Sequence, residues 1–117
     1  MALGGAAGAL ARYAIDRAMV SLIGPTVLGI FVINITGSFL LGLFVSFSMG
    51  RTELPDEIRL LVAVGFFGAY TTFSTLTVAS VQLFESGEIT RGVLNIVGSI
   101  VVDLIAALAG LLVGRAI

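Results

Sequence analysis

Residues 68–75 read GAYTTFST, and they set the architecture of the chain around them. Five of these eight side chains carry a hydroxyl group, yet they lie within 60–84, a run of 25 residues without a charge. Glycine weakens a helix, and Ser and Thr side chains compete for its backbone hydrogen bonds. We therefore interpret residues 68–72 as a break in a membrane helix whose freed carbonyl groups face a partner or an ion. An unbroken helix with hydroxyls bonded to carbonyls one turn earlier is the alternative.

The composition is that of an integral membrane protein. Of the 117 residues, 58% are hydrophobic and 11% are charged, and the mean hydropathy is +1.16. Soluble domains average about 25% charged residues. The chain has no Lys and a net charge of −1, which argues against nucleic acid as a partner because phosphate binding needs clustered cations.

The residue types also argue against an enzyme. The chain contains no Cys and no His, which excludes disulfides, thiolate metal sites and the commonest general base. Because no general base stands beside the Ser/Thr cluster, hydrolytic chemistry fits poorly. The N-terminus lacks a positively charged leader before its apolar run, so we expect no secretory signal.

The hydropathy predicts a single domain, 1–117, with four helices that cross a membrane, which we expect to be the cell inner (plasma) membrane. A spanning helix needs about 20 mostly apolar residues. Charged loops separate the expected spans, which lie at roughly 2–22, 26–49, 60–84 and 92–114.

The first span is the exception, because it contains Arg12, Asp16 and Arg17. Arg12 and Asp16 lie one helical turn apart and can form an ion pair. Either this helix is short or the start of the chain has lost residues, so we expect a truncated or snorkelled first span.

The Arg residues are divided almost equally between the two sides of the membrane. Three fall on one side and two or three on the other, depending on Arg12. Because Arg and Lys in loops set orientation, this near tie favours insertion in both orientations and hence antiparallel dimers. Insertion in one orientation is the alternative. Small residues four apart, such as Gly4 and Gly8 or Gly110 and Gly114, predict close helix contacts.

Polar side chains at membrane depth are the candidates for function. Asn34 offers two donors and an acceptor to an ion, or makes a structural bond between helices. Asn95, Ser99 and Asp103 recur every four residues and share one helix face. Phe73 can present a positive ring edge to an anion, or it simply packs. Together these groups favour passive conduction of a compact, dehydrated anion.

Three stretches resemble the signature sequences of the Fluc-type (CrcB-like) fluoride channels: GGAAGALARY at 4–13, GIFVINITGSFLLG at 29–42 and GFFGAYTTFST at 65–75. The resemblance runs over nearly the whole chain, and the third stretch is the most specific. It implies a passive, fluoride-selective channel that lowers cytoplasmic fluoride. It also implies an antiparallel, dual-topology homodimer of four-helix subunits, each with a break in the third helix, and a structural Na⁺ at the dimer interface.

The resemblance assigns roles to individual residues. The Na⁺ is held by the backbone carbonyl groups of Gly68 and Thr71, and Arg12 lies in the vestibule. The fluoride pathway is lined by Asn34, Phe73, Ser74, Thr75 and Ser99.

The sequence departs from the family pattern at four positions. Leu76 replaces the second Phe of a pair, and Ala79 replaces a Glu. Asp103 stands where a Ser or Thr is frequent, and Ile30 where a Thr is frequent. Because an anionic Asp103 would repel fluoride, we expect it to be neutral or turned away from the ion.

Two other functions fit parts of the sequence. A small multidrug-type, proton-coupled exporter is also four-helical and dual-topology, but it needs a carboxylate deep in its first helix, where this chain has none. The chain also fits one subunit of a heterodimeric fluoride channel, in which the departures mark an unequal partner.

Overall fold

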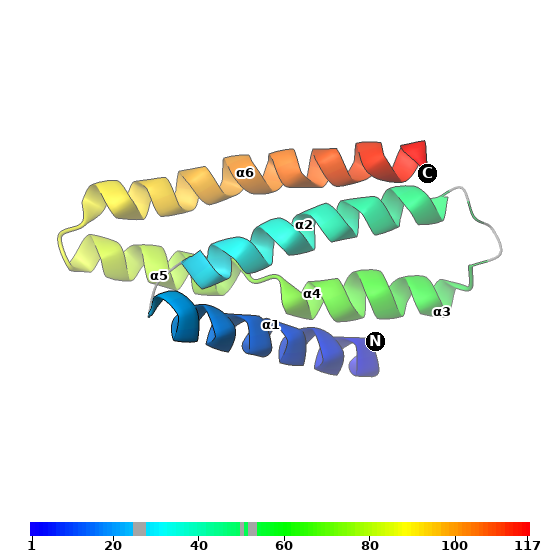
Figure 1. The fold of residues 1–117 in the computed structure, drawn as a ribbon, viewed down its shortest axis with the longest axis horizontal. Coiled ribbons are helices and arrows are strands. Elements are labelled where there is room, and N and C mark those ends of the chain that lie inside the picture. The colour runs from blue at the N-terminus through cyan, green and yellow to red at the C-terminus, as the bar shows by residue number, and fades with distance from the viewer. Residues whose placement is uncertain (25–27, 50, 52–53) are drawn as a thin grey trace.

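The computed structural model describes residues 1–24, 28–49, 51 and 54–117 (Figure 1). Every regular element among these residues is a helix. Three helices are long and unbroken: α1 (Ala2–Ile23), α2 (Leu28–Met49) and α6 (Ile89–Ala116). Between α2 and α6 the chain forms four helical pieces: α3 (Asp56–Arg59), the π-helix η1 (Leu60–Phe66), α4 (Phe67–Tyr70) and α5 (Phe73–Glu85).

The predicted all-α fold of four helices is confirmed, with shifts at the helix ends. The expected start of the second span, at 26, lies outside the described residues. The last helix begins at Ile89 rather than at 92. In the described part of the chain, three segments are long and apolar enough to cross a membrane: Leu28–Met49, Asp56–Glu85 and Ile89–Ala116. The charged α1 has 22 residues, enough for about 33 Å of helix.

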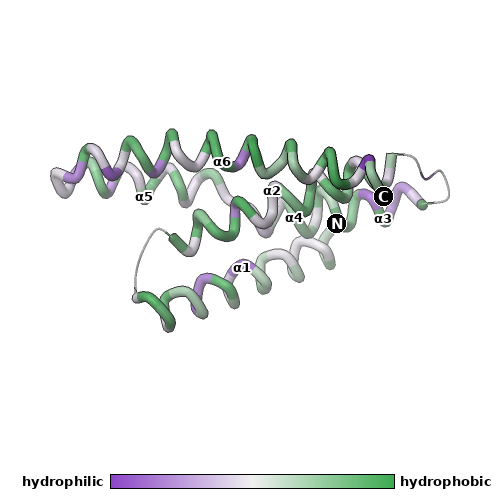
Figure 2. Tube along the Cα trace, turned by 45° about the horizontal axis from the view of Figure 1, so that its top comes forward, coloured by the Kyte–Doolittle hydropathy of each residue, from purple (hydrophilic) through white to green (hydrophobic). Residues whose placement is uncertain are grey.

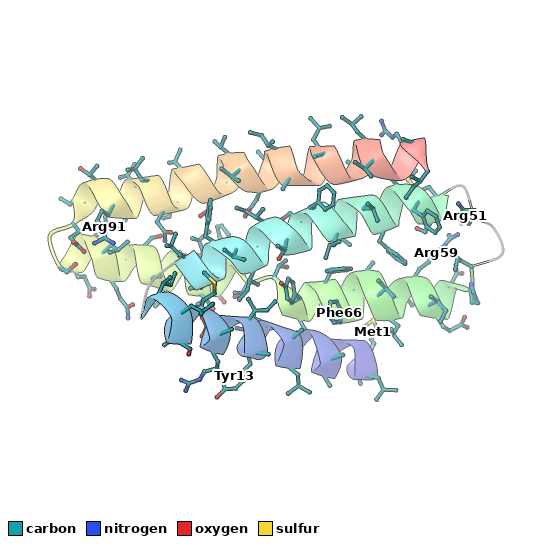
Figure 3. All side chains as sticks on the ribbon, in the orientation of Figure 1. Met1, Tyr13, Arg51, Arg59, Phe66 and Arg91 are labelled. Carbon is teal, nitrogen blue, oxygen red and sulfur yellow. The ribbon has the colours of Figure 1, made fainter. Side chains whose placement is uncertain are left out.

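Charged residues mark the two ends of the molecule. Arg91 lies at the turn between α5 and α6, whereas Arg51 and Arg59 lie at the opposite end (Figure 3). Arg59 Nη2 donates to the carbonyl oxygens of Ser48, at 3.0 Å, and of Arg51, at 2.5 Å. Between these ends, hydrophobic residues dominate α2 and α6 (Figure 2). Only 11% of the most apolar stretch of α6 is buried within the subunit, so its remaining surface faces lipid or another protein.

The helices pack closely at glycines. Helix α2 packs along α6, and α1 packs against η1 and α4. A Cβ atom on Gly8 of α1 would collide with the carbonyl oxygen of Phe66. A Cβ atom on Gly110 of α6 would collide with the carbonyl oxygen of Phe39 in α2. The predicted small-residue contacts therefore form within the subunit.

An aromatic core lies directly before the break in the third helix. It contains the buried side chains of Ile33, Phe67 and Tyr70. The Phe66 ring stacks on Tyr70, with 5.8 Å between centroids, and meets Phe67 edge to face at 5.0 Å. The Tyr70 hydroxyl also shares a 2.9 Å hydrogen bond with Thr36 Oγ1 of α2. This packing fixes the end of α4 against α2.

The break is shorter than the predicted 68–72. Residues 68–70 stay helical, and only Thr71 (φ −84°, ψ 153°) and Thr72 (φ −149°, ψ 119°) adopt extended backbone. Burial of Phe67 and Tyr70 holds the last turn of α4 in a helix despite the intrinsic cost of Gly68, because tertiary packing overrides propensity. The π-helical turn η1, which sequence reasoning missed, directly precedes this turn; π-helical segments are frequent at functional sites.

Candidate ion pathway at the helix break

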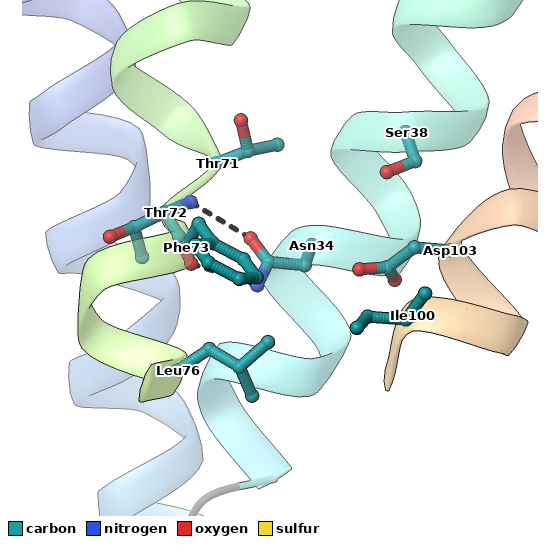
Figure 4. A pocket seen from close by; sticks show the side chains of 8 residues that line it. All are labelled: Asn34, Ser38, Thr71, Thr72, Phe73, Leu76, Ile100 and Asp103. Carbon is teal, nitrogen blue, oxygen red and sulfur yellow. Dashed lines mark hydrogen bonds between the residues drawn. The ribbon is translucent and has the colours of Figure 1, made fainter. Parts of the chain in front are cut away.

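Asn34 of α2 joins the broken helix through two hydrogen bonds to Thr72. Asn34 Nδ2 donates to the Thr72 carbonyl oxygen at 3.0 Å, and the Thr72 N–H donates to Asn34 Oδ1 at 2.9 Å (Figure 4). The Asn34 side chain is buried, and its amide pairs with two backbone groups at the break. This is the structural bond between helices, and it leaves one Nδ2 hydrogen for a further acceptor.

The break removes the helical donors of two carbonyl groups. In a continuous α-helix, the Gly68 carbonyl would accept from the Thr72 N–H, and the Thr71 carbonyl from the Thr75 N–H. Instead, the Thr72 N–H donates to Asn34 Oδ1, and the Thr75 N–H donates to Thr72 Oγ1 at 3.4 Å. Gly68 and Thr71 are the residues to which the family resemblance assigned a Na⁺. Carbonyl oxygens are ligands that hard cations accept.

Thr72 also begins the next helix. It is the N-cap of α5, and its Oγ1 shares hydrogen bonds with Thr75 Oγ1 at 3.0 Å and Ser74 Oγ at 3.4 Å. Ser74 and Thr75 are exposed on the single subunit. The hydroxyl cluster therefore serves capping and leaves its outer side chains on the surface of the subunit.

Arg12 reaches the break from α1. Its Nε donates to the Ala69 carbonyl oxygen at 3.3 Å. It lines a cavity of about 220 Å³ together with Asp16, Thr72 and Thr75. No Arg12–Asp16 ion pair forms, since the ion pair within the described residues joins Arg91 and Glu88. The predicted pair fails because Arg12 is directed at the backbone of the broken helix.

A second cavity, of about 200 Å³, adjoins the break (Figure 4). The approach of α2 to the break depends on Gly37, where a Cβ atom would collide with Thr71 Cγ2. We call this space the break cavity. It is lined by Asn34, Ser38, Thr71, Thr72, Phe73, Leu76, Ile100 and Asp103.

Phe73 and Leu76 occupy this cavity differently. The Phe73 side chain is 67% exposed on the isolated subunit, whereas Leu76 is 3% exposed. Leu76 therefore forms part of the packed wall, and the ring of Phe73 is available to an ion or to a second subunit.

The predicted polar face of α6 is divided between two cavities. Asp103 lines the break cavity, whereas Asn95 and Ser99 line a separate cavity of about 270 Å³ beside Arg91. The Ser99 hydroxyl is buried and has no hydrogen-bond partner among the described residues. The structure thus does not bring Ser99 together with Phe73 within one subunit.

Asp103 is not turned away from the break cavity. Its carboxyl group points from α6 towards α2, beside Asn34 and Ser38 (Figure 4). Its Oδ1 is buried and, in the part of the chain that the structure describes, makes no hydrogen bond. Of the two alternatives expected for Asp103, neutral or turned away from the ion, the second is therefore wrong.

Sequence reasoning missed two polar residues. Ser38 lines the break cavity, and its signal is the spacing of four residues from Asn34 on one helix face. Ser80 is fully buried; it donates to the Leu76 carbonyl at 2.9 Å and accepts from Asn95 Nδ2 at 2.9 Å. No sequence signal distinguishes Ser80 from its neighbours.

These features define a class: a small all-helical membrane protein with polar cavities at a broken central helix, as in proteins that move ions across membranes. Residues 1–111 match the family model described as "CrcB-like protein, Camphor Resistance (CrcB)". The chain belongs to this CrcB-like family.

Curated relatives named "Fluoride-specific ion channel FluC" match the chain over nearly all of its length. The one from Magnetococcus marinus is 39% identical over 118 residues, covering 100% of this chain and 96% of the relative. The one from Rhizobium leguminosarum is 37% identical, covering 100% and 94%. The one from Methylococcus capsulatus is 41% identical over 116 residues, covering 98% of this chain and 51% of a longer relative.

Proposed function

We propose that this chain is a fluoride-specific ion channel that conducts fluoride passively across the membrane and so lowers cytoplasmic fluoride. The observation that carries the proposal is the helix break, where Asn34, Thr71 and Phe73 meet at one cavity. Relatives over the full length of the chain carry the name of fluoride-specific ion channels. These relatives are channels, and the chain is not an enzyme.

The groups at the break suit a compact anion. The second Nδ2 hydrogen of Asn34 and the Ser38 hydroxyl are hydrogen-bond donors, and the exposed edge of Phe73 carries partial positive charge. The first turn of the 13-residue α5 borders the same cavity, and the N-terminal end of a helix attracts anions. Such donors replace the water that fluoride must shed.

A structural Na⁺ at the carbonyl oxygens of Gly68 and Thr71 is part of the proposal. It is supported by the loss of their helical donors at the break. When bound, the cation supplies positive charge beside the break cavity. The thermal midpoint of the purified channel should rise with Na⁺ concentration and not with equal N-methylglucamine, because a ligand of the folded state stabilises it. Identical midpoints would remove Na⁺ from the proposal.

We also propose that the working channel is an antiparallel, dual-topology homodimer. Phe73, Ser74 and Thr75 are exposed on the single subunit at the level of the break. Polar groups exposed to lipid are costly, so a second subunit that covers them supplies the missing wall of the pathway. Arg12 and Ser99, in the two other cavities, then lie along its approaches.

The deciding experiment is ion efflux from liposomes that contain only this purified chain. Fluoride efflux should exceed chloride efflux by orders of magnitude, with protein-free liposomes as the control for leakage. Equal rates for the two anions, or no flux, would contradict the proposal. Activity of the chain alone also separates a homodimer from an obligate pair of unequal subunits.

A further inference from the structure

The break cavity contains one carboxyl group among its eight lining residues. Asp103 enters it from α6, facing Asn34 and Ser38 of α2 (Figure 4). Its buried Oδ1 accepts no hydrogen bond in the described residues. An ionised carboxylate in such a position lacks the partners that usually compensate its burial.

No cationic side chain among the described residues lies in this cavity beside Asp103. Residues 28–49 of α2 include no ionisable group, and α5 carries one only at its far end, Glu85. On α6 itself, Arg91 and Arg115 are each twelve residues from Asp103, about 18 Å along the helix axis. Arg12 lines the neighbouring cavity and donates to Ala69.

Tyr70, the ionisable residue of α4, is hydrogen-bonded outside the break cavity. The Tyr70 hydroxyl shares a hydrogen bond with Thr36 Oγ1. Apart from the proposed Na⁺ beside the cavity, the positive potential in the break cavity therefore comes from backbone dipoles, chiefly the N-terminal turn of α5 at Thr72 and Phe73. That turn is equivalent to about half of an elementary charge, which favours one negative charge beside it and not two.

An ionised Asp103 and a fluoride ion in the same cavity of about 200 Å³ would compete for that potential. Their mutual repulsion at short distance is large in a medium of low dielectric constant. A protonated carboxyl group, in contrast, offers one O–H donor, and O–H donors form strong hydrogen bonds with anions.

We propose that the break cavity holds one negative charge at a time, so that Asp103 takes up a proton when fluoride binds and donates the resulting O–H to the ion. The carboxylate gains one proton from water, one O–H bond forms, and the proton returns to water when fluoride leaves. Asp103 is thus a specificity-determining residue that links fluoride binding to proton uptake. This inference rests on the fluoride pathway proposed above.

The linkage predicts a defined pH profile. Over the pH range in which the anion-free channel carries an ionised Asp103, apparent fluoride affinity should fall about tenfold per pH unit, since one proton is taken up per ion. Asp103→Asn preserves the size of the side chain and an N–H donor but removes the charge. Its fluoride binding and efflux should be independent of pH, and its efflux at the alkaline end should exceed that of the unmodified channel.

The test measures fluoride efflux from liposomes between pH 5.5 and 8.5 for the unmodified channel, Asp103→Asn and Glu85→Gln. Protein-free liposomes correct for the leak of undissociated HF at each pH. Glu85 is an exposed acid at the end of α5, so Glu85→Gln should keep the pH profile of the unmodified channel. A steep profile that only Asp103→Asn flattens supports the proposal.

Two outcomes overturn it. Equal pH profiles in the unmodified channel and Asp103→Asn, with fluoride flux in both, would show that the carboxyl group does not exchange a proton with the ion. Absence of fluoride flux from every variant at every pH would instead overturn the proposed function itself.

A spectroscopic measurement keeps the inference testable if Asp103→Asn assembles poorly. The infrared band of a protonated carboxyl group should increase when fluoride is added to the unmodified channel at constant pH, and chloride should not produce it. Glu85→Gln should retain the fluoride-induced band. No change in the band on adding fluoride would contradict proton uptake.

Discussion

At the scale of single residues, Asn34 shows how one side chain can stabilise a break in a helix by hydrogen-bonding the backbone at the break. The Thr72 N–H lacks a helical partner and donates to Asn34 Oδ1 at 2.9 Å, and the Thr72 carbonyl oxygen accepts a further hydrogen bond from Asn34 Nδ2 at 3.0 Å. An amide presents a donor and an acceptor in one plane, as this pairing requires. The side chain thus stabilises the break and borders the proposed pathway at once.

Asn34→Ala should therefore destabilise the protein as well as abolish fluoride efflux. The Thr72 N–H loses its acceptor, at about 1–3 kcal/mol, and the Thr72 carbonyl loses one hydrogen bond. The measurement is the thermal midpoint in detergent, together with efflux. Asn95→Ala is the matched control, because its loss leaves Ser80 still bonded to the Leu76 carbonyl. Equal destabilisation by both variants would show that the Thr72 bonds have no special weight.

Phe73→Ile should slow fluoride efflux without lowering stability. The side chain is 67% exposed on the subunit, so its replacement leaves no cavity in the subunit core, but the positive ring edge is lost. Efflux and size-exclusion profile are measured together, with Val78→Ala, another exposed position on α5, as the control. Unchanged efflux in Phe73→Ile would remove the ring from the pathway.

At the scale of elements, the third helix changes character three times within the membrane. The π-helix η1 leads into α4, the chain extends at Thr71 and Thr72, and α5 begins with Thr72 as its cap. Helix α2 stabilises this arrangement, because its Asn34 and Thr36 side chains form hydrogen bonds with Thr72 and Tyr70 of the third helix. The approach of α2 to the third helix depends on Gly37.

Gly37→Ala should displace α2 from the break and reduce both stability and efflux. Its methyl group would collide with Thr71 Cγ2 and lie 3.0 Å from the Tyr70 ring, and overpacking of this kind costs about 1–3 kcal/mol. Gly98→Ala on α6 is the control, since a Cβ atom there meets nothing within 4 Å. The measurement compares the thermal midpoints of the two variants. A Gly37→Ala channel as stable as the Gly98→Ala channel would contradict the packing described.

At the scale of the whole molecule, the subunit leaves its polar break only partly enclosed. Three of its helical segments are long and apolar enough to span a membrane, but Phe73 and Thr75 are exposed on the single subunit. The near tie in Arg residues favours insertion in both orientations, as the proposed antiparallel dimer requires.

Dual topology can be tested directly because the chain has no Cys. Ser86→Cys introduces one thiol in the exposed α5–α6 turn. In intact cells, a membrane-impermeant thiol reagent should label about half of the protein, as equal insertion in two orientations requires. Permeabilised cells give the value for full labelling. Labelling of all or none of the protein in intact cells would establish a single orientation.

Much of the fold was predictable because its signals are local. Hydropathy gave the helical membrane class, and Gly68 followed by hydroxyl residues indicated where the third helix breaks. The extent of the break was not predictable, because burial of Phe67 and Tyr70 against Ile33 keeps residues 68–70 helical. The contact of Arg12 was not predictable either, because its side chain donates to the Ala69 carbonyl oxygen instead of pairing with Asp16.

The sequence by itself determined that this chain is a four-helix membrane protein with polar groups at mid-span, since composition and periodicity depend only on neighbours along the chain. Only the tertiary structure decided which groups meet. Asn95, Ser99 and Asp103 share one face of α6, yet α2 and the broken helix place Asp103 in the break cavity and the other two in a separate one. The carbonyl groups of Gly68 and Thr71 lose their helical donors because Asn34, 34 residues before Gly68, and the Thr72 hydroxyl take those N–H groups. A hydrogen bond between segments far apart in the sequence forms only when the helices pack together, and a local sequence pattern does not determine that packing.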